Sequence, residues 1–240
     1  TITLFATLYA VYRLPRMPVD NPQGSPGLRA VWDGLVYLSA HKILLMSFVV
    51  DIIAMVFGMP RALFPQLAHE SFGGPAEGGL AFALLFAGIP AGAVLGGVLS
   101  GWVSRVRREG LAIMWAIAAW GVAMTVMGVA VWFAPLATGA MLGLAVAMLV
   151  VGGAADMSSA AFRQSLLLGA TDDAVRGRLQ GVFIVVVAGG PRIADILHGG
   201  AAEVVGPAVA TAGGGVLVLV GIAVVALLYP RFHRFRLADR

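Results

Sequence analysis

Six apolar segments, each close to twenty residues long, are the feature that most restricts how this chain can fold. They lie at 43–59, 79–101, 111–133, 139–161, 179–200 and 207–229. A helix needs ~20 mostly apolar residues to cross the ~30 Å hydrocarbon core of a bilayer. Sixty per cent of the chain is hydrophobic and 12% is charged, whereas soluble domains are about half apolar and one quarter charged. The sequence predicts an all-α, polytopic membrane bundle with six transmembrane helices.

The basic residues are distributed unevenly among the connecting segments. Fourteen of them lie in one alternating set of connectors, and the other set holds Arg61 alone. The basic set comprises 13–42, 102–110, 162–178 and 230–240. Short connectors rich in Lys and Arg face the cytoplasm, so we expect a cytoplasmic C-terminus. The pI of about 10.1 then reflects topology, and no nucleic-acid partner is expected.

The chain divides into four regions. Residues 1–12 are apolar but span only half a membrane, and we expect them to be the end of a truncated transmembrane helix. Residues 13–42 begin with the Pro- and Gly-rich stretch "PRMPVDNPQGSPG" and continue with apolar residues at helical spacing. They predict a cytoplasmic linker with an amphipathic helix along the membrane face, or alternatively a partner-binding helix. Residues 43–229 form the six-helix bundle, and 230–240 form a cytoplasmic tail.

Small residues recur every four positions in the second segment, at Gly88, Gly92 and Gly96. Such a stripe allows close approach of helix backbones, because lipid offers no hydrophobic drive for association. Pro90 is expected to bend this helix locally. The stripe fits static packing, and it also fits helices that slide against each other during a transport cycle.

Charged residues inside the apolar segments carry more information. Asp51 lies near the middle of the first segment, and Arg192 and Asp195 lie just beyond the middle of the fifth. A charge at mid-span costs about 2.5–3.5 kcal/mol on insertion scales. Either Arg192 and Asp195 therefore form a buried ion pair that fixes helix rotation, or both of them and Asp51 line a polar passage.

The residues before Arg192 favour the polar passage. Gly189, Gly190 and Pro191 are expected to interrupt the helix near the midplane, and discontinuous helices at that depth mark many transporter binding sites. His198 is better explained as a hydrogen-bonded structural histidine than as a proton relay. Further charges lie toward the predicted cytoplasmic helix ends and are gate candidates: Asp156, Arg163, Arg105, Arg107, Arg176 and Arg178.

Three stretches resemble a known family. They are "DIIAMVFGMPRALFPQLA" (51–68), "ADMSSAAFRQSLLLGATDDAVRGRLQGVF" (155–183) and "AGGPRIADILHG" (188–199). They are similar to the enterobactin-exporter-like branch of the major facilitator superfamily, which is bacterial. The resemblance implies helices 7–12 of a twelve-helix fold, with the N-terminal six-helix half missing, in the bacterial inner membrane. One departure is Gly101, which stands where the superfamily's cytoplasmic loop signature has an Asp.

The resemblance further implies a secondary active transporter that exports a siderophore or hydrophobic drug by alternating access, coupled to protons. Asp51 would exchange a proton for substrate. Arg192 would attract an anionic or catecholate-like substrate, or hold Asp195 ionised. Membrane lipid, the substrate and protons would be the partners, and no cofactor is implied.

Two other classes of function stay open. A non-transporting receptor or scaffold could use the same fold. A membrane enzyme is less favoured, because the chain has no HExxH, Walker or nucleophile-elbow motif. Adjacent Asp172 and Asp173 read as the capped start of a helix, and the absence of cysteine excludes thiolate metal sites. We therefore expect neither catalysis nor a bound metal.

Overall fold

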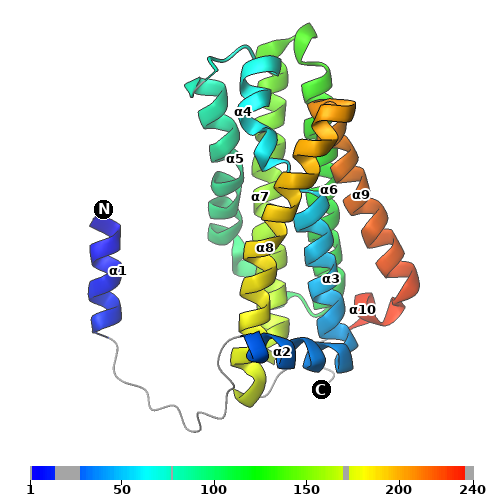
Figure 1. Cartoon of the computed structure of the whole chain (residues 1–240). Helices are drawn as coiled ribbons and strands as arrows, with labels where there is room; N and C mark the ends of the chain where they lie inside the picture. Colours follow the sequence, from blue (N-terminus) through cyan, green and yellow to red (C-terminus); the bar gives the residue numbers. More distant parts are fainter. Residues whose placement is uncertain (1, 14–27, 77, 170–172, 236–240) are drawn as a thin grey trace.

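The computed structural model describes residues 2–13, 28–76, 78–169 and 173–235, and in these ranges the chain is helical without a strand (Figure 1). Six helical segments are long and apolar enough to cross a membrane. The first begins with α3 (Lys42–Phe57) and continues through short helical turns to Ser71. The others are α5 (Gly79–Val98), α6 (Glu109–Trp132), α7 (Thr138–Gly169), α8 (Asp173–Val205) and α9 (Pro207–Leu228). The predicted all-α membrane bundle is confirmed.

Short elements extend the first span and connect the others. After α3 the chain passes through η1 (Arg61–Leu63), α4 (Phe64–Gln66) and η2 (Leu67–Ser71), whereas η3 (Ser100–Arg105) and η4 (Ala134–Leu136) follow α5 and α6. The turn between α8 and α9 needs Gly206, whose φ of +83° is unfavourable for other residues. Pro207 then occupies the first turn of α9, where its missing N–H has no helical partner to lose.

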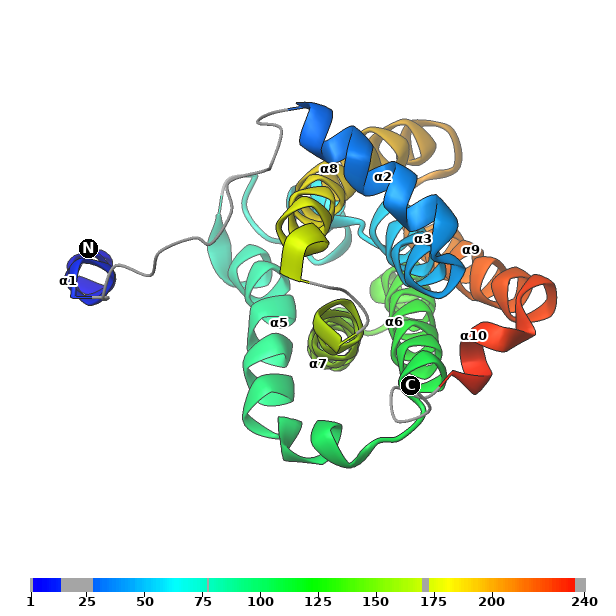
Figure 2. The same ribbon diagram turned by 90° about the horizontal axis from the view of Figure 1, so that it is seen from below.

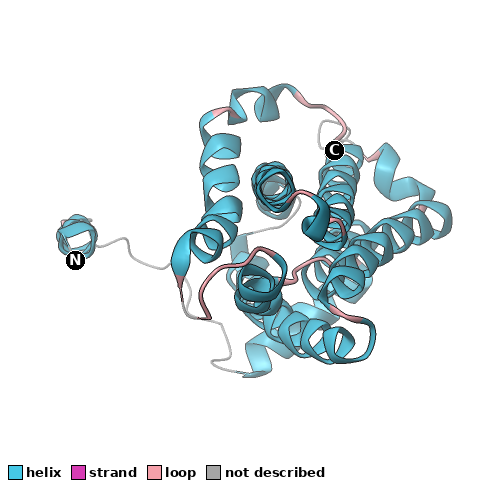
Figure 3. Ribbon diagram, turned by 90° about the horizontal axis from the view of Figure 1, so that it is seen from above, coloured by secondary structure: helices cyan, strands magenta, loops and turns pink. Residues whose placement is uncertain are grey.

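Helices α5, α7, α6 and α9 pack side by side in that order. Viewed along the bundle, α7 lies between α5 and α6, and α9 lies on the far side of α6 (Figure 2). Helix α8 packs mainly on α3, α9 and α2 (Leu28–Ala40), and it touches α7 only slightly. The view from the opposite end shows the same order (Figure 3). Contacts between the α3–α8 pair and α7 are therefore few.

Three outer elements complete the chain. Helix α2 runs crosswise under α8 and α3, at the same end of the bundle as the five-residue α10 (Pro230–Arg234) (Figures 1 and 2). Helix α1 (Ile2–Tyr12) stands apart from the bundle (Figure 1). Part of the predicted linker, 14–27, and part of the predicted tail, 236–240, lie outside the described residues.

The glycine stripe of α5 lies against α7. A Cβ atom on Gly88 would stand 2.7 Å from the Cβ of Leu149, and one on Gly92 would overlap the carbonyl oxygen of Val150. A Cβ on Gly96 would lie 2.9 Å from the carbonyl oxygen of Ala154. Helix α5 stays continuous through Pro90. These glycines let the α5 and α7 backbones approach closely.

Two features differ from the sequence expectations. Helix α7 extends to Gly169, beyond the predicted end of its span at 161, so Arg163 is a helical residue and not part of a connector. The expected interruption at Gly189–Pro191 is wrong, since α8 is continuous with Pro191 inside it. Proline removes one backbone donor and the neighbouring bonds maintain the helix. Gly190 serves packing instead, because a Cβ there would lie 2.9 Å from the Cβ of Met55 on α3.

Candidate functional site

A buried ion pair joins α3 to α7 in the membrane-spanning region. The Nη1 atom of Arg163 contacts the Oδ2 atom of Asp51, and the two side chains are only 5% and 2% exposed. The helices are otherwise in slight contact at this place. Removing two charges from water is costly unless they neutralise each other, so this pair is a buried charged link between the α3–α8 pair and the rest of the bundle.

A second carboxylate shares the same arginine. The Nη2 atom of Arg163 lies 3.9 Å from the Oδ1 atom of Asp156, which is on α7 two turns before it. The side chain of Asp156 is 31% exposed, far more than that of Asp51. Two carboxylates therefore face one guanidinium, and only one of them opens to the surface.

The surroundings of the pair are partly polar and partly aromatic. The guanidinium carbon of Arg163 lies 5.9 Å from the ring centre of Phe183 on α8, and its Nε donates to the backbone carbonyl of Ser159 at 3.4 Å. The buried hydroxyl of Ser159 has no hydrogen-bond partner in the described structure. Gln164, the residue after Arg163, donates to Gln180 of α8 at 3.4 Å. The site thus stands at the junction of α3, α7 and α8.

The hollow beside the ion pair is small. It has a volume of about 10 Å³ and is lined by Ser47, Phe48, Asp51, Arg163, Leu167 and Phe183. A cavity needs roughly 10–15 Å³ to hold one water molecule. In this conformation the pair is therefore closed to anything larger than a water molecule.

The second pair of charges is placed differently. Arg192 and Asp195 lie on α8, with Nη1 and Oδ2 3.8 Å apart, and their side chains are 84% and 34% exposed. The neighbouring Ala194 is buried, whereas Ile196 is 76% exposed, so Arg192 lies on the face of α8 that points away from the helices described here. The structure does not bring Asp51 together with Arg192 or Asp195.

His198 has a structural contact. Its Nε2 atom donates to the backbone carbonyl of Phe57 at 3.0 Å. Phe57 is the last residue of α3, where helical carbonyls lack intrahelical partners. The histidine therefore ties α8 to the end of α3 and satisfies a carbonyl that would otherwise be unpaired.

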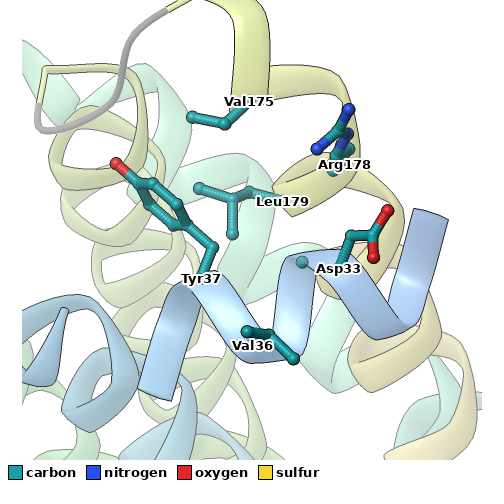
Figure 4. Close-up of a pocket in the computed structure, with 7 residues that line it drawn as sticks. Asp33, Val36, Tyr37, Val175, Arg178 and Leu179 are labelled. Atoms are coloured by element: carbon teal, nitrogen blue, oxygen red, sulfur yellow. The ribbon is translucent and has the colours of Figure 1, made fainter. Parts of the chain in front are cut away.

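The remaining gate candidates are dispersed. Arg105 and Arg107 are exposed at and beyond the end of η3. Arg178 lies beside Asp33 of α2 in a hollow of about 210 Å³ between α2 and α8 (Figure 4). The side chain of Arg176 lies outside the described residues. Of the predicted helix-end charges whose side chains are described, only Asp156 and Arg163 lie beside Asp51.

Sequence reasoning missed the partner of Asp51 and the polar residues around it. Ser47 stands four residues before Asp51, and Ser159 stands four residues before Arg163. Both serines are buried. Residues four apart share a helix face, so the spacing of polar residues within the apolar segments was a usable signal. Among the described residues, no group of three His, Cys, Asp or Glu side chains could hold a metal ion.

Comparison with known proteins points to one group of relatives. The chain is 29% identical to the enterobactin exporter of Citrobacter koseri, and 28% identical to those of Salmonella typhimurium and Salmonella typhi. Each match covers 97% of this chain and 53% of the relative, so the chain spans about half the length of these curated relatives. No protein-family model matches the chain, and no solved structure matches it significantly. Along nearly its whole length the chain is similar to the C-terminal half of bacterial exporters of the major facilitator superfamily, and the resemblance inferred from three stretches of sequence is confirmed.

Proposed function

We propose that this chain is the C-terminal half of a secondary active transporter in the bacterial inner membrane. The transporter exports a small molecule, of which a siderophore is the first candidate, in exchange for protons. The likeness to enterobactin exporters supports the substrate class. The observation that carries the coupling is the buried cluster in which Asp51 and Asp156 share the single guanidinium of Arg163.

The charge balance of this cluster provides a place for one proton. Two ionised carboxylates against one guanidinium leave one surplus negative charge, and an uncompensated charge is costly in a poorly solvated site. A proton bound to either carboxylate removes that surplus. Asp156, which is 31% exposed, gives the proton a route from the surface to the cluster. Asp51 is the buried carboxylate that accepts this proton.

The position of the cluster connects protonation to movement. It lies where α3 and α8 meet α7, and direct contacts of α3 and of α8 with α7 are otherwise few. Protonation of Asp51 weakens its attraction to Arg163, so the α3–α8 pair becomes free to shift against α7. A ligand shifts the equilibrium between two helix arrangements only if it binds one of them more tightly than the other. The proton binds Asp51 more tightly in the arrangement in which Asp51 is separated from Arg163.

Arg192 provides the contact with substrate. A charge that faces lipid near mid-span costs about 2.5–3.5 kcal/mol, so the exposed face of α8 that carries Arg192 needs a polar cover. In our proposal this face lines the cleft between the two halves of the transporter. The guanidinium of Arg192 then attracts the anionic or catecholate oxygens of a siderophore.

The coupling is tested with the two halves together in proteoliposomes. A pH gradient should drive export of enterobactin, with proton movement in the opposite direction recorded by a pH-sensitive dye. Asp51→Asn should abolish the dependence on the pH gradient while downhill transport persists. Glu203→Gln, a matched change at an exposed carboxylate of α8, should leave coupling intact. Unchanged coupling in Asp51→Asn removes the cluster from the mechanism.

The substrate class is tested separately. Arg192→Ala should slow transport of the anionic siderophore at least tenfold and leave transport of a neutral hydrophobic drug within twofold. Equal effects on both substrates would show that Arg192 does not select for negative charge.

A further inference from the structure

A basic hollow opens at the end of the bundle where α3 begins and α9 ends. Its volume is about 480 Å³, and its lining comprises Ala40, His41, Lys42, Ile43, Leu44, Tyr229, Arg231 and Phe235. Lys42 and Arg231 come from α3 and α10, two elements far apart in sequence. Among the described residues that line the hollow, none is acidic. The fold therefore gathers positive charge in a concave site.

The two permanent cations of the hollow have no counter-charge among the described residues. Neither Lys42 nor Arg231 pairs with a carboxylate in the part of the chain that the structure describes. Like charges gathered in one hollow repel each other and are stabilised by a shared anion. The start of α3 adds to this effect, because the first N–H groups of a helix have no intrahelical acceptor and His41 provides no side-chain cap.

His41 is held in a fixed position. Its ring stacks on Tyr37 of α2 with the ring centres 3.9 Å apart, and its Nδ1 donates to the backbone carbonyl of Tyr37 at 2.9 Å. Tyr37 in turn lies against Val175 and Leu179 of α8 (Figure 4). The Nε2 atom is then the ring nitrogen that a ligand in the hollow can reach.

The depth of the hollow identifies the source of the anion. Lys42 is the first residue of one membrane span and Tyr229 follows the last residue of another, so the hollow lies at the level of the lipid headgroups. Tyr is typical of this interface. Ile43, Leu44 and Phe235 supply an apolar floor, which suits the glycerol and acyl part of a lipid better than a free, fully hydrated anion.

We propose that this hollow binds the phosphodiester headgroup of an anionic phospholipid, with Lys42 and Arg231 as the charged contacts. Basic pockets between transmembrane helices are known to take such headgroups. The proposal does not depend on transport, since it rests on the hollow formed by α2, α3, the end of α9 and α10. It assigns a role to a cluster of charges that the exchange of protons and substrate does not use.

The test measures lipid retention on the purified chain. Native mass spectrometry counts dioleoyl phosphatidylglycerol molecules bound after transfer from detergent, with dioleoyl phosphatidylcholine as the neutral comparison. Arg231→Gln and Lys42→Gln should each weaken phosphatidylglycerol binding about fivefold, the factor that corresponds to roughly 1 kcal/mol for each basic residue near the membrane. Arg231→Lys should retain binding. Circular dichroism and size-exclusion chromatography confirm that each variant is folded.

Arg234→Gln is the matched control, because it makes the same change on the same short helix. Arg234 lines a different hollow, together with Arg108, Leu111 and His233. The Arg234→Gln substitution should leave phosphatidylglycerol retention unchanged. An equal loss in Arg231→Gln and Arg234→Gln would show diffuse attraction without a site. Equal retention of phosphatidylcholine, or displacement of the lipid by millimolar glycerol phosphate, would also overturn the proposal.

Discussion

The two pairs of opposite charges within the spans differ in almost every physical respect. Asp51 and Arg163 join two helices and are nearly inaccessible, whereas Arg192 and Asp195 are neighbours on one helix, and Arg192 is 84% exposed. A buried pair is costly to form and very costly to break, because either partner left alone is an unpaired charge. An exposed pair contributes little to stability. The first pair therefore links α3 to α7, whereas Arg192 of the second pair is accessible from outside the described helices.

The largest expected effect is that of removing the buried cation. Arg163→Ala leaves Asp51 without its partner and should lower the free energy of unfolding by about 3–5 kcal/mol. Unfolding in detergent, followed by circular dichroism against denaturant, measures the loss. Arg192→Ala is the matched control on α8. A comparable loss in both variants would erase the difference between the two pairs.

Replacing both partners of the buried pair should recover much of that loss. Asp51→Leu combined with Arg163→Met removes the desolvated charges together, and such replacements are often neutral for stability. The double variant should be more stable than Arg163→Ala by about 2 kcal/mol and yet lack proton coupling in the transport assay. A double variant as unstable as the single one would show that packing, and not charge, holds α3 on α7.

The two adjacent glycines of α8 test which face of the helix is packed. Gly190→Ala forces a shift at Met55 and should destabilise the bundle by about 1–3 kcal/mol. Gly189 has open space around it, so Gly189→Ala should be neutral or stabilising by up to about 1 kcal/mol. Thermal unfolding of the two variants gives the comparison. A reversed order would mean that α8 is rotated relative to its placement here.

The smallest effect is expected at the exposed pair. Asp195→Asn should change the free energy of unfolding by about 0–1 kcal/mol, and raising the salt concentration should reduce even this effect by screening. Denaturation of the wild type and the variant at low and high salt measures it. A loss above 2 kcal/mol that resists salt would show that Asp195 is part of the core.

The apolar segments predicted the six spans because length and hydropathy are local properties. The partner of Asp51 was not predicted, because Arg163 lies far along the chain in a stretch that contains Ser, Gln and Asp and reads as the start of a connector. Its helix continues because one face of that stretch is buried, as Phe162 and Leu166 show. The predicted helix interruption at Gly189, Gly190 and Pro191 failed for the opposite reason. The local preference of these residues for a break is overridden by the packing of α8 on Met55.

Helices α7 and α8 are longer than a bilayer requires. Thirty-two residues of α7 extend about 48 Å at 1.5 Å per residue, against ~30 Å of hydrocarbon. Gln164 and Gln180 link the two helices toward their shared end. Arg163 stands six residues, about 9 Å, before the end of α7, so we expect a change in the Asp51–Arg163 contact to alter the aqueous end of α7 and, through Gln164 and Gln180, the neighbouring end of α8.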